Sequence, residues 1–492
     1  MKASRVFFIA VAILLTAGCV FAQDSSSRKA KNVILMIGDG MGFNSDLAGT
    51  YYRYGQENAQ SYHKFPKRLA CTTFSITDDD FDPKKDKGYD PEVFWKSFLG
   101  GREGTDHTTV TDSAASATAI NTGTKTLNGR IGMDFMAKPL KSYAQYAAEA
   151  NRSIGIVTTV TLCHATPGAV IAHMPSRNMY TEISREQMLD QPVSVLFGGG
   201  HPDFERCKPA AKPVEKRDYK FVGGKYVWGE LKKNAGFADA QLITNKDEFE
   251  ALAAALPGSG KKLPTKVIGV PHTQYLAPVS GGVDNDDAVK QLYSEEEVAD
   301  LPSLATMATA ALNVLQQNDK GFYLMIEGGA IDSQNHARNI DKMVLEHTAF
   351  SKAIDAVCAW VEKYSSWEDT LLIITADHET GQLWGPGTYT DANNNRLYDK
   401  DEAFNGHKQI VNNGKGIVPT VQYGYSSHSN ALVPMWINGA GSKYIDRFIR
   451  GNDAKAASFW KFSGDYIDNT DIVPFLRKAS GLDKKVEKQK GK

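Results

Sequence analysis

The chain has 492 residues, 42% of them hydrophobic and 23% charged, so it is long enough to bury a large core. Its 56 Lys and Arg residues nearly balance 57 Asp and Glu residues, and the basic residues are scattered along the chain. This distribution excludes the basic footprint of a protein that recognises nucleic acid. Alternating apolar runs and helical stretches favour a globular α/β protein.

The first residues have the pattern of an export signal. A basic start is followed by an apolar run at residues 6–15, which is too short for a comfortable membrane span. Val20-Phe21-Ala22 is a cleavage signal of the small-residue type, so residues 1–22 are interpreted as a secretory signal peptide. Thr16-Ala17-Gly18-Cys19 leaves open a lipid anchor at Cys19. Both interpretations predict an exported protein, periplasmic or secreted, without a transmembrane span.

Three short apolar runs, residues 32–37, 322–326 and 371–376, have the character of buried strands in a mostly parallel sheet. We therefore expect an α/β fold in which a central sheet is sandwiched between helices. Ligands of such sheets gather at the carboxyl ends of the strands. Residue types that bind metals follow all three runs, namely Asp39, then Glu327, Asp332 and His336, then Asp377 and His378. This pattern predicts a multinuclear metal site.

A candidate nucleophile lies at the start of an Ala-rich stretch. Asp112 and Ser113 precede residues 114–119, which have high helix propensity, so Ser113 is expected at or beside a helix N-terminus. Backbone N–H groups and the helix dipole favour an anion there, and the hydroxyl could attack phosphorus. An ordinary N-cap is the alternative interpretation.

Seven segments stand in order between residues 37 and 434, namely Ile37-Gly38-Asp39-Gly40-Met41-Gly42, residues 111–119, His164-Ala165-Thr166-Pro167, residues 172–178, residues 327–336, Thr375-Ala376-Asp377-His378-Glu379, and His428 with Val433-Pro434. Together they give the chain a strong resemblance to the alkaline phosphatase family. The resemblance implies hydrolysis of phosphate monoesters through a covalent phosphoserine at Ser113.

The resemblance also implies two zinc ions and one magnesium ion per chain. One zinc would be held by Asp332, His336 and His428, and the other by Asp39, Asp377 and His378. The magnesium site would combine Asp39 with Thr166 and Glu327. Imidazole and carboxylate suit zinc, and Asp332 and His336 would share one face if their segment is helical. Oxygen ligands suit magnesium.

Two further positions are assigned by the resemblance. Arg177 is similar to the family's phosphate clamp, since its planar fork suits two phosphate oxygens; a surface salt bridge is the alternative. His164 stands where some members carry Asp and others His, and Ser333 replaces a Lys or His found in many relatives. This combination leaves the identity of the third metal open. A histidine that merely packs beside Cys163 is the alternative for His164.

The sequence argues against two other functions and leaves two alternatives. Gly38-Asp39-Gly40-Met41-Gly42-Phe43 is similar to a dinucleotide fingerprint, but Phe43 replaces the third glycine and Asp39 would repel pyrophosphate. Sulfatases need a Pro-x-Arg signature after their nucleophile, whereas Ala114-Ala115-Ser116 follows Ser113. A phosphodiesterase of the same superfamily and a catalytically inactive secreted metal-binding protein remain as alternatives.

Residues 31–480 are expected to form one catalytic domain, with further strands at residues 153–160, 193–197 and 431–437. By resemblance, residues 379–427 are a variable insertion near the active-site entrance, and the protein is a homodimer. Residues 481–492 have the composition of a disordered basic tail. After signal cleavage four cysteines remain, Cys71, Cys163, Cys207 and Cys358, and their spacing selects neither a disulfide pairing nor free thiols.

The insertion contains a candidate calcium loop. Residues 391–402 place oxygen side chains at loop positions 1, 3, 5, 9 and 12, which is EF-hand-type spacing. Arg396 occupies position 6, where glycine normally permits the sharp turn. A solvated turn rich in Asn and Asp is therefore the alternative to a calcium site.

Overall fold

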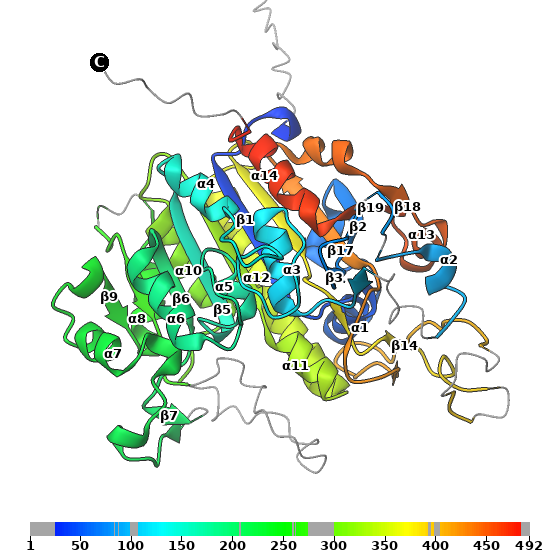
Figure 1. Cartoon of the computed structure of the whole chain (residues 1–492), viewed down its shortest axis with the longest axis horizontal. Helices are drawn as coiled ribbons and strands as arrows, with labels where there is room; N and C mark the ends of the chain where they lie inside the picture. Colours follow the sequence, from blue (N-terminus) through cyan, green and yellow to red (C-terminus); the bar gives the residue numbers. More distant parts are fainter. Residues whose placement is uncertain are drawn as a thin grey trace, which may run out of the picture.

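The computed structural model describes residues 25–483 except 83, 87, 99–106, 206–207, 258–259, 261, 274–299, 392–394 and 398–403. Within these residues one large sheet of 11 strands forms the centre of the molecule (Figure 1). From edge to edge its strands are β18 (Gly451–Asn452), β19 (Asp465–Asp468), β2 (Lys67–Thr72), β17 (Val433–Gly439), β12 (Thr370–Thr375), β1 (Asn32–Gly38), β11 (Phe322–Gly328), β5 (Ser153–Thr161), β6 (Val193–Gly199), β10 (Val267–Gly269) and β9 (Gln241–Ile243).

The three strands predicted to carry metal ligands are immediate neighbours. β1 pairs in parallel with β11 on one side and with β12 on the other, and Ile37 lies opposite both Glu327 and Thr375. Every residue of these three strands is buried, as their continuous apolar character predicts. Parallel neighbours end at the same edge of the sheet, so the segments that follow them converge.

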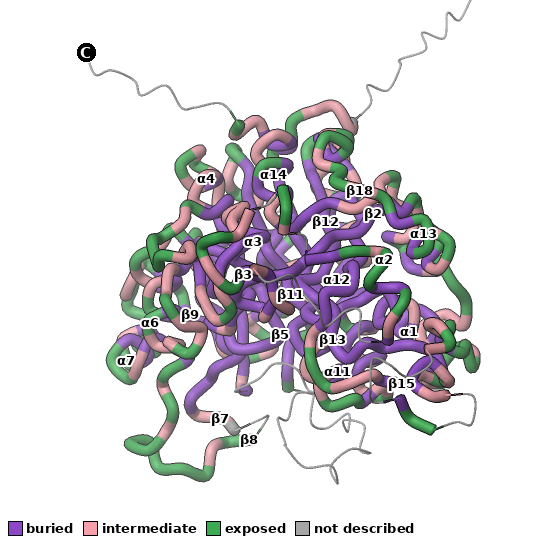
Figure 2. The backbone as a smooth tube through the Cα atoms, turned by 45° about the vertical axis from the view of Figure 1, so that its right-hand side comes forward, coloured by how far each residue is buried: buried purple, intermediate pink, exposed green. Residues whose placement is uncertain are grey.

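Helices cover both faces of the sheet (Figure 1). One layer contains α1 (Phe43–Tyr54), α8 (Lys246–Ala254), α10 (Leu304–Leu315) and the long α12 (Ile340–Tyr364), which contact one another in series. The other layer contains α3 (Ser113–Thr122), α4 (Tyr143–Glu149), α5 (Ala165–Gly168) and α14 (Ile472–Ser480). Figure 2 shows that the buried residues concentrate in the sheet and in the helix faces turned toward it.

The smaller elements lie outside the large sheet. Residues of the predicted insertion form β13 (Glu379–Thr380), β14 (Leu383–Trp384) and β15 (Gln422–Tyr423), and β13 pairs with β16 (His428–Ser429). The remaining short strands and α-helices of the described residues are β3 (Ser75–Ile76), β4 (Thr108–Thr109), β7 (Phe204–Glu205), β8 (Lys208–Pro209), α2 (Pro91–Phe94), α6 (Tyr180–Arg185), α7 (Lys225–Lys232), α11 (Ala330–His336) and α13 (Ala454–Trp460).

The fold class is confirmed, since seven of the ten strand pairings in the large sheet are parallel. The strands predicted at residues 153–160 and 193–197 are β5 and β6. The strand predicted at residues 431–437 was placed too early, because β17 begins at Val433. Ala431 and Leu432 are buried in an aromatic cluster, which explains their apolar character without a strand.

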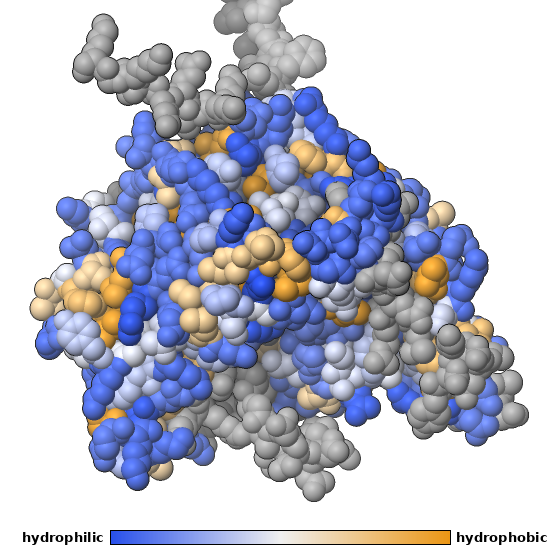
Figure 3. Space-filling view, viewed as in Figure 1, coloured by the Kyte–Doolittle hydropathy of each residue, from blue (hydrophilic) through white to orange (hydrophobic). Residues whose placement is uncertain are grey.

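The structure also bears on the predictions for the cysteines, the two ends of the chain and membrane spans. Cys71, Cys163 and Cys358 are free thiols, and Cys207 lies outside the described residues. The signal peptide and residues 484–492 also lie outside them. Among the described helices, none has the length and apolar character needed to cross a bilayer. The face shown in Figure 3 is mostly hydrophilic, with hydrophobic side chains in small separate groups.

The calcium-loop prediction is only partly covered by the structure. Positions 392–394 and 398–402 lie outside the described residues. The Asp391 carboxylate accepts hydrogen bonds from the backbone N–H of Asn395, at 2.7 Å, and from its side-chain amide, at 3.0 Å. Arg396 donates to the carbonyl oxygen of Gly424. The Asp391 carboxylate is therefore already engaged by Asn395, as in a polar turn rich in Asn and Asp.

Candidate metal centre and nucleophile

The first cluster of candidate ligands lies at the ends of β1 and β12. Asp39 follows β1, and Asp377 and His378 follow β12; all three are buried. His378 Nε2 lies 3.6 Å from Asp39 Oδ1 and 3.2 Å from Asp377 Oδ2. The other oxygen of Asp377 accepts the backbone N–H groups of Gly40, at 3.1 Å, and of His378, at 2.9 Å. These bonds fix the carboxylate while one of its oxygens faces the centre of the cluster.

The second cluster joins α11 to β16. Asp332 and His336 are four residues apart on α11, as the helical prediction requires, and His428 begins β16. His336 Nε2 lies 3.3 Å from Asp332 Oδ2, and His428 Nε2 lies 3.5 Å from Asp332 Oδ1. The two Nε2 atoms are only 2.9 Å apart.

The other ring nitrogen of each histidine determines what its Nε2 can do. His336 Nδ1 contacts the carbonyl oxygen of Ser426 at 2.8 Å, and His428 Nδ1 contacts that of Thr111 at 2.9 Å. Carbonyl oxygens only accept, so both Nδ1 atoms carry hydrogen, and a neutral ring then presents a lone pair at Nε2. Two lone pairs and the Asp332 carboxylate therefore face one point, which is the arrangement that orients histidines in zinc sites.

A third cluster shares Asp39 with the first. Asp39, His164 and Glu327 form a candidate cation site, in which Glu327 is on β11 and His164 precedes α5. Thr158, on β5, donates a hydrogen bond to one Glu327 oxygen. Thr166 is fully buried on α5 and opposes the rise in the pKa of Glu327. Asp39 thus belongs to two clusters.

Burial and mutual repulsion shift the carboxyl groups toward protonation. Burial, followed by the charges of Asp377 and Asp332, raises the pKa of Asp39 well above its usual value. Burial chiefly raises the pKa of Glu327 to about 8 and that of Asp377 to about 6. Burial also lowers the pKa of His378 well below its usual value. The protein alone therefore gathers more negative charge than it neutralises.

Asp332 and His336 behave differently because they stabilise each other. Burial would raise the pKa of Asp332, but hydrogen bonds from His336 and His428 outweigh it and hold that pKa well below its usual value. Burial would lower the pKa of His336, but the same pairing raises it to about 9. A proton on His336 thus occupies the place that the geometry offers to a cation.

The unpartnered atoms of the site test whether metal ions fit it. Within the described residues, both oxygens of Asp39, one of Glu327 and one of Asp377 are buried without a hydrogen-bond partner. Buried polar atoms without partners are costly and need an explanation. Cations at the three clusters would satisfy these atoms, and carboxylate and imidazole are ligand types of zinc, as carboxylate and hydroxyl oxygens are of magnesium. The residues therefore fit metal ions.

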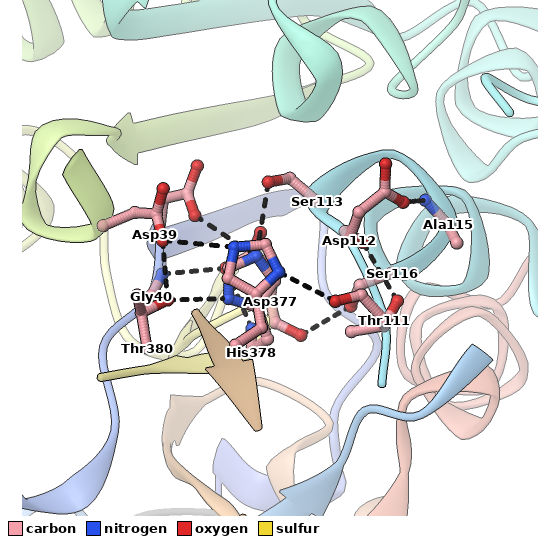
Figure 4. Close-up of polar contacts among 12 residues, drawn as sticks. Asp39, Gly40, Thr111, Asp112, Ser113, Ala115, Ser116, Asp377, His378 and Thr380 are labelled. Atoms are coloured by element: carbon pink, nitrogen blue, oxygen red, sulfur yellow. Dashed lines mark hydrogen bonds and ion pairs between the residues drawn. The ribbon is translucent and has the colours of Figure 1, made fainter. Parts of the chain in front are cut away.

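Ser113 is the first residue of α3, as the sequence predicted. The Asp112 side chain caps the helix by accepting the Ala115 N–H at 2.9 Å, and Gly123 ends it in the left-handed conformation. Ser113 Oγ lies 3.3 Å from His378 Nε2, and Figure 4 shows the hydroxyl pointing toward the Asp39 and His378 side chains. The helix N-terminus thus brings its hydroxyl to the first cluster, with the positive end of the dipole behind it.

Arg177 lies beside the nucleophile. Its Nη1 donates to Asp112 Oδ2 at 3.0 Å, and its Nη2 lies 3.4 Å from His164 Nε2. The bond to Asp112 couples the guanidinium to the residue that caps α3. Burial opposes the charge, but Asp112 outweighs it and raises the pKa of Arg177, so the cation persists at alkaline pH. The site can therefore hold a phosphate oxygen next to Ser113.

The sequence predicted no role for three polar residues of the site. Thr380 Oγ1 donates to Asp332 Oδ1 at 2.6 Å and lies 3.2 Å from His378 Nδ1, so it touches both the first and the second cluster. Ser116 Oγ donates to the Asp377 carbonyl oxygen at 2.6 Å, and Thr158 supports Glu327. The one signal for Thr380 and Ser116 was their position, two residues after His378 and three after Ser113.

Comparisons with known proteins agree on one family. The family model for alkaline phosphatase matches residues 30–479. Alkaline phosphatase H of Pseudomonas aeruginosa (strain UCBPP-PA14) is 30% identical over 409 residues, which cover 77% of this chain and 76% of that protein. The alkaline phosphatase of Escherichia coli (strain K12) is 29% identical over 408 residues, covering 77% of each.

Solved structures show the same fold. The structure of alkaline phosphatase from the Antarctic bacterium TAB5 matches with a TM-score of 0.59 at 23% identity, covering 93% of this chain and 100% of that one. The Thermus thermophilus alkaline phosphatase also gives 0.59, at 19% identity and 97% coverage of both chains. From the family model and the relatives we conclude that this chain belongs to the alkaline phosphatase family and is a hydrolase of phosphate monoesters.

Proposed function

We propose that the chain hydrolyses phosphate monoesters through a covalent phosphoserine at Ser113, with two zinc ions and one magnesium ion bound. The observation that carries this proposal is the meeting of Ser113 Oγ with the Asp39, Asp377 and His378 cluster at a helix N-terminus. Bound metal ions would supply the positive charge that lowers the pKa of the serine hydroxyl and of water and offsets charge on the phosphate. Among the described residues none singles out one alcohol, so we expect broad use of monoesters, with a rate that rises into alkaline pH.

The reaction has two displacements at phosphorus. Ser113 Oγ loses its proton and forms a bond to phosphorus, while the bond between phosphorus and the alcohol oxygen breaks and the alcohol takes up a proton. Water then attacks phosphorus, the bond to Ser113 breaks, and inorganic phosphate leaves. Arg177 holds non-bridging oxygens through both steps, and its tie to Asp112 keeps it aligned with α3. Two inversions retain the configuration at phosphorus.

The test uses a phosphate ester labelled at phosphorus and the Ser113→Ala variant. We expect acid-quenched wild type to carry label at Ser113, and Ser113→Ala to lose the label and at least about 1,000-fold in kcat, because the nucleophile is gone. Ser458→Ala, at an exposed serine of α13, is the control and should match wild type. Label at another serine would contradict the assignment. Turnover and labelling by wild type would exclude an inactive metal-binding protein. A diester substrate tests the phosphodiesterase alternative.

For the metal ions we propose Asp332, His336 and His428 at one zinc, Asp39, Asp377 and His378 at the second, and Asp39, Thr166 and Glu327 at the magnesium. His164 lies in the third cluster beside them. Neutral imidazole organises a hydrated hard cation less well than a carboxylate, and burial with the Arg177 charge lowers the pKa of His164 to about 3.

A substitution in the third cluster tests its selectivity. We expect His164→Asp to retain magnesium about 10-fold more tightly than wild type, since it adds a carboxylate to Asp39 and Glu327. The measurement is a magnesium titration of both proteins loaded with zinc. In the TAB5 enzyme, variants with a histidine replaced by Glu or by Asp were solved with Mg bound in the M3 site. Equal affinity for magnesium in the two proteins would refute this proposal for His164.

Four broader assignments belong to the same proposal. Residues 31–480 act as one catalytic domain, supported by a sheet whose strands run from residue 32 to residue 468. Residues 379–427 are an insertion near the entrance, supported by β14 and β15. The protein is exported after cleavage behind Ala22, which the mass of the mature N-terminus would test. It forms a homodimer, which light scattering would test.

We also propose a calcium ion in the 391–402 loop, where it would compete with Asn395 for the Asp391 carboxylate. Thermal melts with and without calcium, on wild type and on Asp391→Ala with Glu402→Ala, decide it. A calcium-dependent shift that survives the double substitution would place the ion elsewhere.

A further inference from the structure

A chain of buried hydrogen bonds runs from a lysine to the backbone of a candidate metal ligand. Lys125 Nζ donates to Asn469 Oδ1 at 2.7 Å and forms an ion pair with Asp468 Oδ2 at 3.0 Å. Asn469 Nδ2 donates to Ser116 Oγ at 3.1 Å, and Ser116 Oγ donates to the Asp377 carbonyl oxygen at 2.6 Å. Figure 4 shows the last of these bonds. Every residue of this hydrogen-bond network is buried, with Lys125 the most exposed at 8%.

The donors and acceptors of these groups allow only one direction of hydrogen bonding along the network. An ammonium group only donates, so the oxygen of the Asn469 amide faces Lys125 and its NH₂ faces Ser116. Ser116 Oγ then uses a lone pair to accept, and its single hydrogen is available for the Asp377 carbonyl. The Lys125 charge, held in the interior by Asp468, thereby fixes the orientation of a hydroxyl that lies two residues further along the network.

The hydrogen-bond network ends beside the candidate nucleophile and two candidate metal ligands. Ser116 lies one helical turn after Ser113 on α3, and Asp377 directly precedes His378. The bond between Ser116 and Asp377 therefore ties the helix that carries the nucleophile to the segment that carries two candidate ligands. The 3.3 Å separation of Ser113 Oγ and His378 Nε2 depends on the relative placement of these two segments. A shift of about 1 Å is enough to cost catalytic rate.

We propose that Lys125, Asn469 and Ser116 are positioning residues that hold Ser113 in register with Asp377 and His378. This inference rests on the proposed function, because it assigns these residues to the same nucleophile and ligands. The short 3-10 turn Asn469–Asp471, which follows β19, contributes to the site in this way through Ser116.

The main test is Asn469→Asp, which keeps the shape of the side chain and changes its hydrogen-bonding character. A carboxylate accepts from both Lys125 and Ser116, so the Ser116 hydroxyl turns toward residue 469 and the Asp377 carbonyl loses its donor. We expect kcat to fall about 10-fold, and zinc to transfer to a chromogenic chelator about 10-fold faster. Ser116→Ala should show the same two changes, and it should fold because Ala suits a helix interior.

Asn121→Asp is the matched control. Asn121 lies on the same helix and is 1% exposed; its amide donates to the Ala117 carbonyl at 2.8 Å and accepts from the Tyr323 hydroxyl at 3.1 Å. The same chemical change there should lower the melting temperature while leaving kcat and zinc transfer at wild-type values. The network would be structural only if Asn469→Asp and Ser116→Ala behaved like this control, and the proposal would then be wrong.

The two readouts also separate this proposal from the proposed function. Zinc transfer is measured without substrate, so it tests the network even if wild type forms no phosphoserine. A wild type that binds zinc but never labels Ser113 would refute the proposed mechanism alone. Normal labelling of wild type with unchanged zinc transfer and kcat in both variants would refute the network alone.

Discussion

A single residue, Thr380, links the first and second clusters of candidate metal ligands. Its hydroxyl donates to Asp332, so its lone pair is available to the His378 Nδ1–H at 3.2 Å. That arrangement places the hydrogen of His378 on Nδ1 and leaves Nε2 free toward Ser113 and the ligand cluster. One hydroxyl therefore orients a candidate ligand of each of the two proposed zinc sites.

The first prediction concerns this hydroxyl. Thr380→Val keeps the shape of the side chain and removes both contacts, so kcat with an aryl phosphate should fall about 10- to 100-fold, with faster loss of zinc. Thr380→Ser should recover most of the rate, because it restores the hydroxyl. Steady-state kinetics with metal analysis give the measurement, and a Val variant with wild-type kcat and zinc content would contradict the role.

At the scale of the elements, a buried carboxylate holds α1 against its neighbours. Asp46 on α1 accepts from the Tyr62 hydroxyl at 2.6 Å and contacts His347 Nε2 at 3.1 Å through one oxygen, and contacts His63 Nε2 at 2.9 Å through the other. Tyr62 and His63 lie between α1 and β2, and His347 is on α12. Burial would raise the pKa of Asp46, but the two histidines outweigh it and hold the pKa well below 3.8.

A lowered pKa gives this contact a defined pH dependence. The ionised carboxylate stabilises the fold fully above its ordinary pKa of 3.8, and that stability is lost progressively as the pH falls toward the lowered value. Asp46→Asn should therefore cost roughly 3 kcal/mol at pH 7, with a smaller cost at pH 3. Urea unfolding of metal-free protein at both pH values measures it.

Asp446→Asn is the control for Asp46→Asn. Asp446 pairs with Lys67 at 2.6 Å on the surface, where its side chain is 56% exposed, so the substitution should cost less than about 1 kcal/mol. An equal effect of both substitutions at pH 7 would show that the buried cluster around Asp46 does not stabilise the fold as described.

The elements also show how far sequence reasoning reaches. β1, β11 and β12 were predictable because strands buried on both faces are continuous apolar runs, and α3 because Asp112 caps an Ala-rich segment. The strands beyond β17 were not predicted, since β18 and β19 are short and β2 begins with Lys67 and Arg68.

Contacts within the site set a similar limit. The ligand residues could be proposed from the resemblance because each stands in a recognisable motif. Ser116 and Asn469 could not, because their contact joins residues 353 positions apart and neither residue type signals metal or phosphate chemistry. Their role depends on the folded arrangement rather than on a local pattern.

At the scale of the whole molecule, metal ions should be a major source of stability. Ions that bind the folded chain and not the unfolded chain stabilise by mass action, about 2.7 kcal/mol for one site at 100 times its dissociation constant. Removal with a strong chelator should abolish activity and lower the melting temperature, and zinc with magnesium should restore both. Activity that persists after the metals are shown to be gone would contradict the metal assignment.

The metal-free fold should also weaken as the pH rises. The raised pKa of Glu327, about 8 against 4.5, and of His336, about 9 against 6.5, mean that the folded chain holds protons which the unfolded chain releases. The stability that these two groups contribute therefore falls between pH 4.5 and 9. Melting of chelated protein at pH 6 and at pH 8.5 measures this loss, and metal loading should reduce the difference between the two.

The position of β1 in the sheet has a consequence for how the chain folds. Residues 32–38 pair with residues 370–375 on one side and with residues 322–328 on the other, so the first strand made is among the last to find its partners. Such long-range pairing is slow, and until it occurs an apolar segment stays uncovered and prone to aggregate. The two candidate ion-binding clusters that contain Asp39 cannot form before this late event. Zinc uptake during refolding would therefore report the closing of the sheet, and zinc would increase the yield of native chains rather than the rate at which they appear.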